Sequence, residues 1–181
     1  MCIILFYFIL SIFPFFNLFI YLFIYSHLFS NCVTLGSCDP ILKVECLGQK
    51  YKKVAPEKAV THCIFDELFV FSFKSLDPTA LSEGLIRLSV NDCRTTIFDP
   101  TRLLGEFEVE AGHVYQSGDD HEWYKQWVPL TLGGHTADVC VRGFLLVSIQ
   151  VVGPGDKTKI HNESREEKLR ADIKLPADVG K

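Results

Sequence analysis

The stretch FLLVSIQVV at residues 144–152 decides the fold class, because its apolar side chains recur at every second position. This period is typical of a strand that packs one face against a core. The side chains expected on that face are Leu145, Val147, Ile149 and Val151. The stretch therefore predicts a long, half-buried strand near the end of the folded domain.

Four further runs upstream have the same period: residues 41–47, 68–73, 85–90 and 103–109. In the last of them we expect the core face to consist of Leu103, Gly105, Phe107 and Val109. Turn-forming pairs such as Asp77-Pro78 separate the runs, and no long amphipathic helix interrupts them. Short strands without alternating helices predict an all-β fold, an antiparallel β-sandwich.

The chain has 181 residues, 22% of them charged, and a formal net charge of −4. This length fits one domain with tails and excludes a large multidomain enzyme. The acidic balance argues against nucleic acid as a partner, because binding phosphates requires a basic face. We expect the folded domain at residues 31–156 and a charged linker at residues 157–181.

Residues 1–30 contain no Asp, Glu, Lys or Arg and hold eight of the fifteen Phe. A helix of this length, at about 1.5 Å per residue, would cross a hydrocarbon core of about 30 Å. Three interpretations stay open: a transmembrane helix or signal anchor, a cleaved signal peptide, and non-coding sequence translated through a faulty gene model. The signal peptide is the weakest, because no Lys or Arg precedes the apolar run and no small-x-small cleavage site follows it.

The seven cysteines lie at residues 2, 32, 38, 46, 63, 93 and 140, and no two are spaced as C-x-x-C. An odd number without this motif indicates neither a zinc knuckle nor a full disulfide framework. Several fall at apolar positions of the predicted strands, so we expect buried, reduced thiols.

Five motifs follow one another in a specific order: LLGEF (103–107), GHVY (112–115), HEWYKQWVPL (121–130), VRGFL (141–145) and VVGPGD (151–156). This series resembles the ferlin family and is most similar to the second C2 domain of ferlins. The stretch SCDPILKVE at residues 37–45 and the lysines after it are similar to the start of C2 domains in general. The resemblance covers roughly residues 35–180 and implies a C2 β-sandwich within a fragment of a longer protein.

A C2 sandwich implies eight strands, the first of them upstream of Asp39. This chain offers only the apolar segment there. Either residues 16–25 supply that strand or the fold lacks an edge strand.

The resemblance also implies calcium-binding loops at one end of the sandwich. Their ligand positions correspond to Asp39, Asp92 and, as an outer ligand, Asp99, whereas Val33 and Arg94 stand where further carboxylates are expected. Calcium takes six to eight oxygen ligands. We therefore expect at most a weak, incomplete Ca²⁺ site and no certain cofactor.

Membrane contact, unlike calcium binding, does not require a complete set of oxygen ligands. The candidate lipid-binding residues are Lys43, Lys50, Lys52 and Lys53 on neighbouring strands, and Ile97 and Phe98 at a loop tip. Each lysine near an anionic surface contributes about 1 kcal/mol, and burying one large apolar side chain contributes about 1.5–3 kcal/mol. The alternative is that these lysines form only a solvated face.

No motif in the sequence supports catalysis, since G-x-S-x-G, H-E-x-x-H and a glycine-rich phosphate loop are all absent. We therefore expect a non-enzymatic, membrane-associated C2 module that faces the cytoplasm and binds anionic phospholipid, with a role in vesicle traffic and membrane fusion. Other C2 domains or trafficking proteins are possible partners. The alternative is a C2 sandwich that serves as a protein–protein scaffold and binds neither lipid nor Ca²⁺.

Overall fold

The computed structural model describes residues 17–28, 38–54, 62–74, 76–92, 102–132, 140–159 and 161. The strands in this part of the chain are β1 (Asn17–Leu28), β2 (Pro40–Cys46), β3 (Gln49–Val54), β4 (His62–Cys63), β5 (Glu67–Lys74), β6 (Leu85–Asp92), β7 (Arg102–Glu110), β8 (Glu122–Leu132) and β9 (Cys140–Val152). Two short helices, α2 (Pro78–Glu83) and α3 (Ala111–Tyr115), lie at strand connections.

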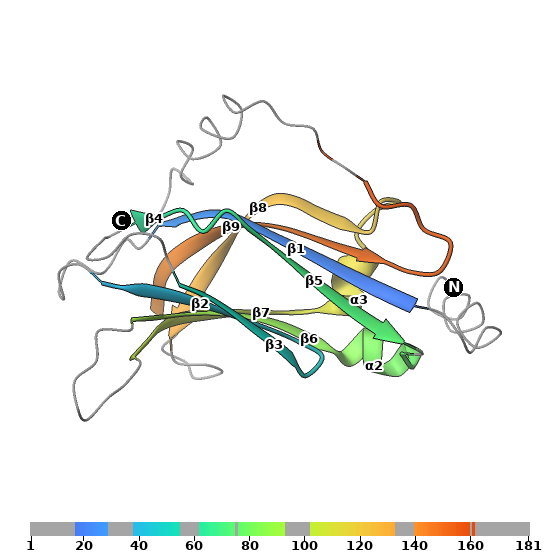
Figure 1. Cartoon of the computed structure of the whole chain (residues 1–181), viewed down its shortest axis with the longest axis horizontal. Helices are drawn as coiled ribbons and strands as arrows, with labels where there is room; N and C mark the ends of the chain where they lie inside the picture. Colours follow the sequence, from blue (N-terminus) through green and yellow to red (C-terminus); the bar gives the residue numbers. More distant parts are fainter. Residues whose placement is uncertain are drawn as a thin grey trace.

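These strands pair antiparallel along the path β3-β2-β6-β7-β8-β9-β1-β4, and β5 pairs with β1 beside β4. Strands β7 and β8 pair at one position only, Glu106 with Thr131, so the path bends there into two layers (Figure 1). One layer contains β3, β2, β6 and β7, and the other contains β8, β9, β1 and β5. The fold is the expected all-β, antiparallel sandwich.

Strand β1 lies inside the apolar segment that the sequence set apart from the domain. It pairs with β9 along one edge and with β5 along the other. Its inward side chains, Leu18, Ile20, Leu22 and Ile24, are at most 5% exposed. The apolar segment therefore supplies the first strand, and the sandwich begins upstream of the expected boundary at residue 31.

The expectation of a membrane-spanning helix is wrong for residues 17–28, because they form this strand. Among the described residues, no helix combines the length and the hydropathy needed to cross a membrane. A strand that is apolar on both faces has no period-two signal, which is why its sequence resembles a buried helix. Residues 1–16 of the segment lie outside the described residues.

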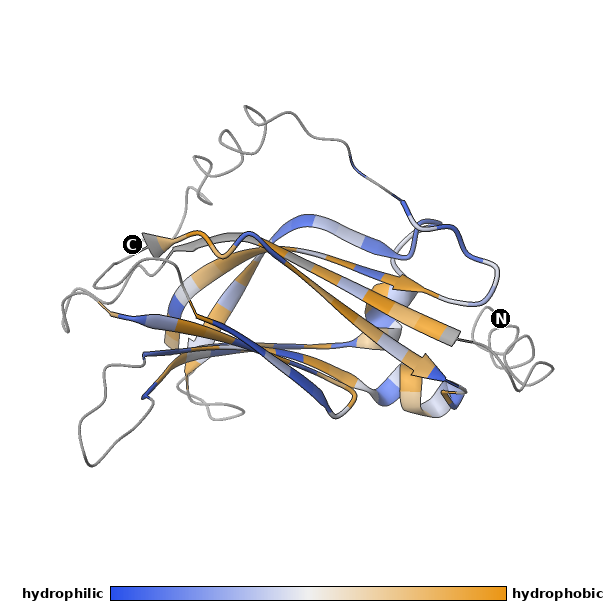
Figure 2. Cartoon of the chain, viewed as in Figure 1, coloured by the Kyte–Doolittle hydropathy of each residue, from blue (hydrophilic) through white to orange (hydrophobic). Residues whose placement is uncertain are grey.

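The core forms where the inward positions of both layers meet, and Figure 2 shows hydrophobic residues alternating with polar ones along the strands. Strand β2 alternates between buried and half-buried residues, and β5 alternates between buried and exposed ones. In β6 the predicted inward residues Ile86, Leu88 and Val90 are fully buried, and so are the four predicted core residues of β9. On the other face of β9, however, Leu146, Ser148, Gln150 and Val152 are at most 7% exposed, so the expectation that this strand is only half-buried is wrong. The predicted period-two faces are confirmed for β2, β5 and β6.

Strand β7 departs from its predicted alternation at one residue. Val90 of β6 pairs with Gly105, whereas the next residue, Asn91, pairs with Leu103. Leu104 is thus an extra residue in β7, a β-bulge that turns its side chain to the core, where it is 8% exposed. The expectation that Leu103 rather than Leu104 faces the core is wrong for this reason.

The cysteines in the described residues are all free thiols. Cys38, Cys46 and Cys63 are buried as expected, and burial raises the pKa of Cys46 to about 12, so its thiol is neutral at pH 7. Cys140 is exposed, because it begins β9 at the surface, so the expectation of burial is wrong there. The other three cysteines lie outside the described residues.

Replacing Leu22 by Ala tests whether β1 belongs to the core. Leu22 is completely buried, so the variant should lose about 2–5 kcal/mol of unfolding free energy in urea denaturation. Leu85, which is 40% exposed on β6, provides the control, and Leu85→Ala should cost less than about 0.5 kcal/mol. Equal, small losses in the two variants would show that β1 does not contribute to the core.

Candidate functional site

A tight hairpin between β2 and β3 positions the candidate basic residues. Leu47 and Gly48 connect the two strands, and both have positive φ angles, of 44° and 86°. Two such residues are typical of the type I′ turn, whose twist matches that of the flanking strands. This turn fixes the register, which begins with Cys46 opposite Gln49 and continues to the far end of the hairpin.

The register places Lys43 directly opposite Lys52 on the outer face of the sandwich. On the next strand, Ser89 of β6 lies opposite Lys43. Neither lysine forms an ion pair with a residue that the structure describes. Side chains directly opposite one another lie about 4.5–5.5 Å apart at their Cβ atoms, and like charges in such pairs are destabilising. The two cations are thus held together without a carboxylate between them.

The neighbouring row of the same face is electrically balanced. It runs from Lys50 to Glu45, Arg87 and Glu108 on four successive strands. The Lys50 ammonium lies 3.2 Å from the Glu45 carboxylate, and Arg87 pairs with Glu108 and lies 3.9 Å from Glu45. The hydrogen bond and the charge of Glu108 raise the pKa of Arg87 further. Lys50 and Arg87 are therefore partly neutralised, unlike the lysines of the adjacent row.

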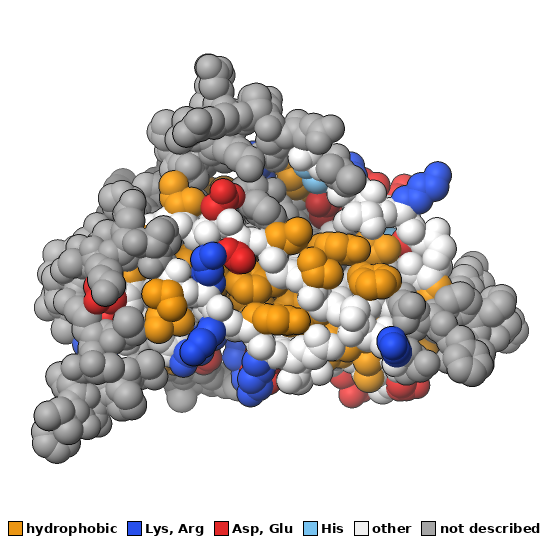
Figure 3. Space-filling model, in the orientation of Figure 1, with side chains coloured by type: hydrophobic (Ala, Val, Ile, Leu, Met, Phe, Trp, Pro, Cys, Tyr) orange, Lys and Arg blue, Asp and Glu red, His pale blue; other side chains and the backbone are white. Residues whose placement is uncertain are grey.

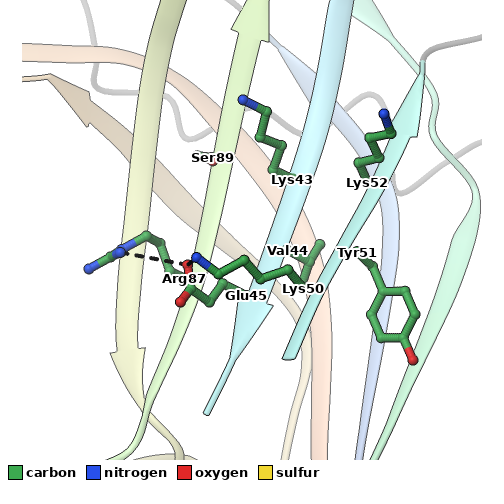
Figure 4. Close-up of a pocket in the computed structure, with 8 residues that line it drawn as sticks. All are labelled: Lys43, Val44, Glu45, Lys50, Tyr51, Lys52, Arg87 and Ser89. Carbon is green, nitrogen blue, oxygen red and sulfur yellow. Dashed lines mark ion pairs between the residues drawn. The ribbon is translucent and has the colours of Figure 1, made fainter. Parts of the chain in front are cut away.

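These residues line an open hollow of about 400 Å³ on the outer face of β2, β3 and β6. Its lining consists of Lys43, Val44, Glu45, Lys50, Tyr51, Lys52, Arg87 and Ser89. Figure 4 shows the two unpaired lysines extending from neighbouring strands, with Lys50 and Arg87 beside Glu45. The hollow offers ammonium groups and a hydroxyl, the donors that a phosphate group accepts.

The fourth candidate lysine, Lys53, lies on the other side of β3. Strand β3 alternates, so Lys53 shares a side with Tyr51 and is directed at the second layer. There it forms an ion pair with Glu67 of β5. The structure thus brings together three of the four predicted lysines and separates Lys53 from them.

The candidate calcium ligands Asp39 and Asp92 come together where β2 begins and β6 ends. The backbone N–H of Asp39 donates to Oδ1 of Asp92 at 3.0 Å. Among the described residues, no three His, Cys, Asp or Glu side chains converge in a way that could hold a metal ion. Two carboxylates fall well short of the six to eight oxygens that calcium takes, so the described residues do not fit a complete site. Asp99, Ile97 and Phe98 lie outside the described residues.

Sequence reasoning missed Ser89, Arg87 and Glu45 as parts of the hollow. They lie on two strands and are up to 44 residues apart in the chain, between Glu45 and Ser89. Their alternation with buried residues was visible, but their side-by-side placement depends on the register of β2 with β6. Only the two-residue turn at Leu47-Gly48 could have indicated the register within the β2–β3 hairpin.

Calcium binding is expected to be weak, with a dissociation constant of about 10⁻⁴ M or higher, because so few carboxylates converge. Isothermal titration of the metal-free protein with CaCl₂ measures it. The same titration of the variant with Asp39→Asn and Asp92→Asn identifies any heat that these carboxylates contribute. A low-micromolar dissociation constant that is lost in the variant would contradict this expectation.

No family model matches the sequence. The chain is 27% identical to myoferlin of Xenopus tropicalis over 147 residues, which cover 80% of this chain. It is 29% identical to ferlin 2 of Tetrahymena thermophila over 132 residues, or 71% of this chain. The chain spans only 7% of the length of each of these relatives.

Among solved structures, the SMP-C2A-C2B domains of extended synaptotagmin 2 align with 75% of this chain and 27% of theirs. The TM-score is 0.55 at 12% sequence identity, so this likeness concerns the fold. The resemblance to ferlins and the C2 fold expected from the sequence are both confirmed. The chain is similar to ferlins, and its described residues form a C2 sandwich.

Proposed function

We propose that this domain docks on membranes rich in anionic phospholipid through the outer face of β2, β3 and β6. The observation that carries the proposal is the pair formed by Lys43 and Lys52, two cations held directly opposite each other without a carboxylate partner among the described residues. This pair costs stability in the free domain. An anion bound between the two ammonium groups relieves the repulsion, so the arrangement favours a bound phosphate.

The geometry of the hollow supports a lipid headgroup as that anion. The lysines extend from a sheet face rather than from a deep pocket, so a headgroup can reach them while its acyl chains stay in the bilayer. Ser89 adds a hydroxyl beside Lys43, and Lys50 lies in the next row. Since the whole chain has a net charge of −4, attraction to an anionic surface has to come from such a local patch. The patch acts within a Debye length of about 8 Å at physiological salt.

The similarity to myoferlin and ferlin 2 supports a cellular context for the proposed activity. We infer a non-enzymatic role in vesicle traffic and membrane fusion, with the domain on the cytoplasmic side of the membrane. The linker at residues 157–181 would then connect this domain to others in a longer chain. Calcium is not required in this proposal, because the attraction arises from the lysines.

Vesicle co-sedimentation tests the proposal. The full chain should bind vesicles that contain phosphatidylserine or a phosphoinositide, with and without calcium, and binding should weaken as salt rises. Charge reversal of the unpaired lysines, Lys43→Glu with Lys52→Glu, should weaken binding at least about thirtyfold, since each lysine contributes about 1 kcal/mol.

The matched control changes the net charge equally at a site remote from the hollow. Lys157→Glu with Lys159→Glu does so in the exposed stretch after β9, and it should leave most of the binding intact. Equal losses in both variants would mean that net charge alone governs binding. If the unchanged chain binds no vesicle in any condition, the lysines form a solvated face and the scaffold function is favoured instead.

A further inference from the structure

Exposed apolar side chains gather on one side of the sandwich, where β5 and β3 lie at the open edges of the two layers. Within the described residues, six large apolar side chains are exposed: Tyr51, Val54, Ile64, Leu68, Val70 and Leu85. All except Leu85 belong to β3, to β5 or to the residues between β4 and β5. Figure 3 looks onto this side and shows hydrophobic side chains gathered at its centre. Such clustering marks an interaction surface more often than scattered apolar residues do.

Strand β5 also has an edge there with which no described strand pairs. Among the described strands it pairs with β1 alone. The Ser72 carbonyl accepts a hydrogen bond from the Gln49 side chain at 3.0 Å, so the backbone groups of Ser72 are directed away from β1. Residues two apart in a strand point the same way, so Leu68 and Val70 direct their N–H and C=O groups to the same edge.

The hydrogen bonding of β9 supports this assignment independently. The Val151 N–H donates to the His121 carbonyl, which lies on the side away from β1. Backbone groups of successive strand residues point to opposite edges, so the N–H and C=O of Val152 are directed at β1. Val152 is paired with Phe19, so the backbone N–H and C=O of Phe19 are directed at β9 rather than at β5. Its other neighbour, Ser72, therefore has no backbone partner in β1 at this position.

We propose that β5 pairs antiparallel with β5 of a second copy of this chain, with Val70 on the two-fold axis. In this register Val70 lies opposite Val70 of the other copy, and Leu68 lies opposite Ser72, whose carbonyl exchanges its hydrogen bond from the Gln49 side chain for one from the Leu68 N–H. Exposed Asp66 precedes β5 at a φ of 42°, so in each copy it lies at the end of the ladder, close to exposed Lys74 of the other copy. Shifting the register by two residues either way loses these two charge pairs. The surface is thus complementary to itself, with apolar contacts at the centre and opposite charges at both ends.

Within one copy, Asp66 and Lys74 are too distant to pair. Eight residues of extended chain separate them by about 25 Å. Neither side chain has an ion-pair partner among the residues that the structure describes. An attraction between these two residues can therefore arise only between copies, which makes it a specific signature of the proposed register.

Sedimentation velocity of the full chain over a range of concentrations tests the proposal. The unchanged chain should form a dimer whose population rises with concentration. Asp66→Lys alone, or Lys74→Asp alone, should weaken the dimer at least about tenfold, because each substitution turns two symmetric attractions into repulsions. The swap that combines Asp66→Lys with Lys74→Asp should restore the dimer to within about threefold of the original.

A second pair of variants tests the apolar centre. Val70→Lys places like charges on the two-fold axis and should abolish the dimer, whereas Leu85→Lys, at a residue of similar exposure on β6, should leave it unchanged. Circular dichroism of each variant verifies that it is folded. A chain that stays monomeric up to its solubility limit overturns the proposal. So does a dimer that withstands both single charge changes, or one that the double swap fails to restore.

Discussion

Backbone pairing of β1 with β9 and β5 is the interaction on which the rest of the sandwich depends. Among the described strands, β5 has β1 as its sheet neighbour, so the layer that contains β5 exists only because β1 joins it to β9. The inward side chains of β1 fill the centre of the core, where Ile20, Leu22 and Ile24 are completely buried. Residues 17–28 of the apolar segment are thus part of the folded domain and contribute to its stability.

The period-two geometry of the strands separates the chemistry of the domain onto different surfaces. On the outer face of β2 and β3 it exposes Lys43 and Lys52, whereas one residue further along β3 it directs Lys53 into an ion pair with Glu67 between the layers. On β5, which belongs to the other layer, it exposes Leu68 and Val70. A domain that docks through its basic face would leave the edge of β5 accessible to a second copy, so the two proposed contacts are geometrically compatible.

Local patterns in the sequence predicted most of the fold. The strands with one buried face, such as β5 and β6, were visible because apolar and polar residues alternate in them. Strand β1 was predicted only as one of two alternatives, because leucine and isoleucine alternate with aromatic residues in it and both faces are apolar. The bulge at Leu104 was also missed, since an extra residue in β7 is defined only by its pairing with β6.

The candidate site was predictable to a smaller extent. The lysines were found from their spacing, but which of them share a face with Ser89 and which one pairs across the layers depends on long-range register. The two aspartates, Asp39 and Asp92, were placed together through the resemblance to C2 domains, and the structure brings them together through a backbone hydrogen bond. No local pattern indicates that bond, because it joins residues 53 positions apart.

Hydrogen–deuterium exchange of the full chain in aqueous buffer, followed by mass spectrometry, tests the central claim most directly. If β1 is an inner strand of the sandwich, peptides that cover residues 17–24 should exchange as slowly as peptides from β9, because both strands would open only with the core. Exchange of residues 17–24 that is as fast as in an unfolded peptide, while β9 remains protected, would show that the apolar segment lies outside the domain and would contradict this account.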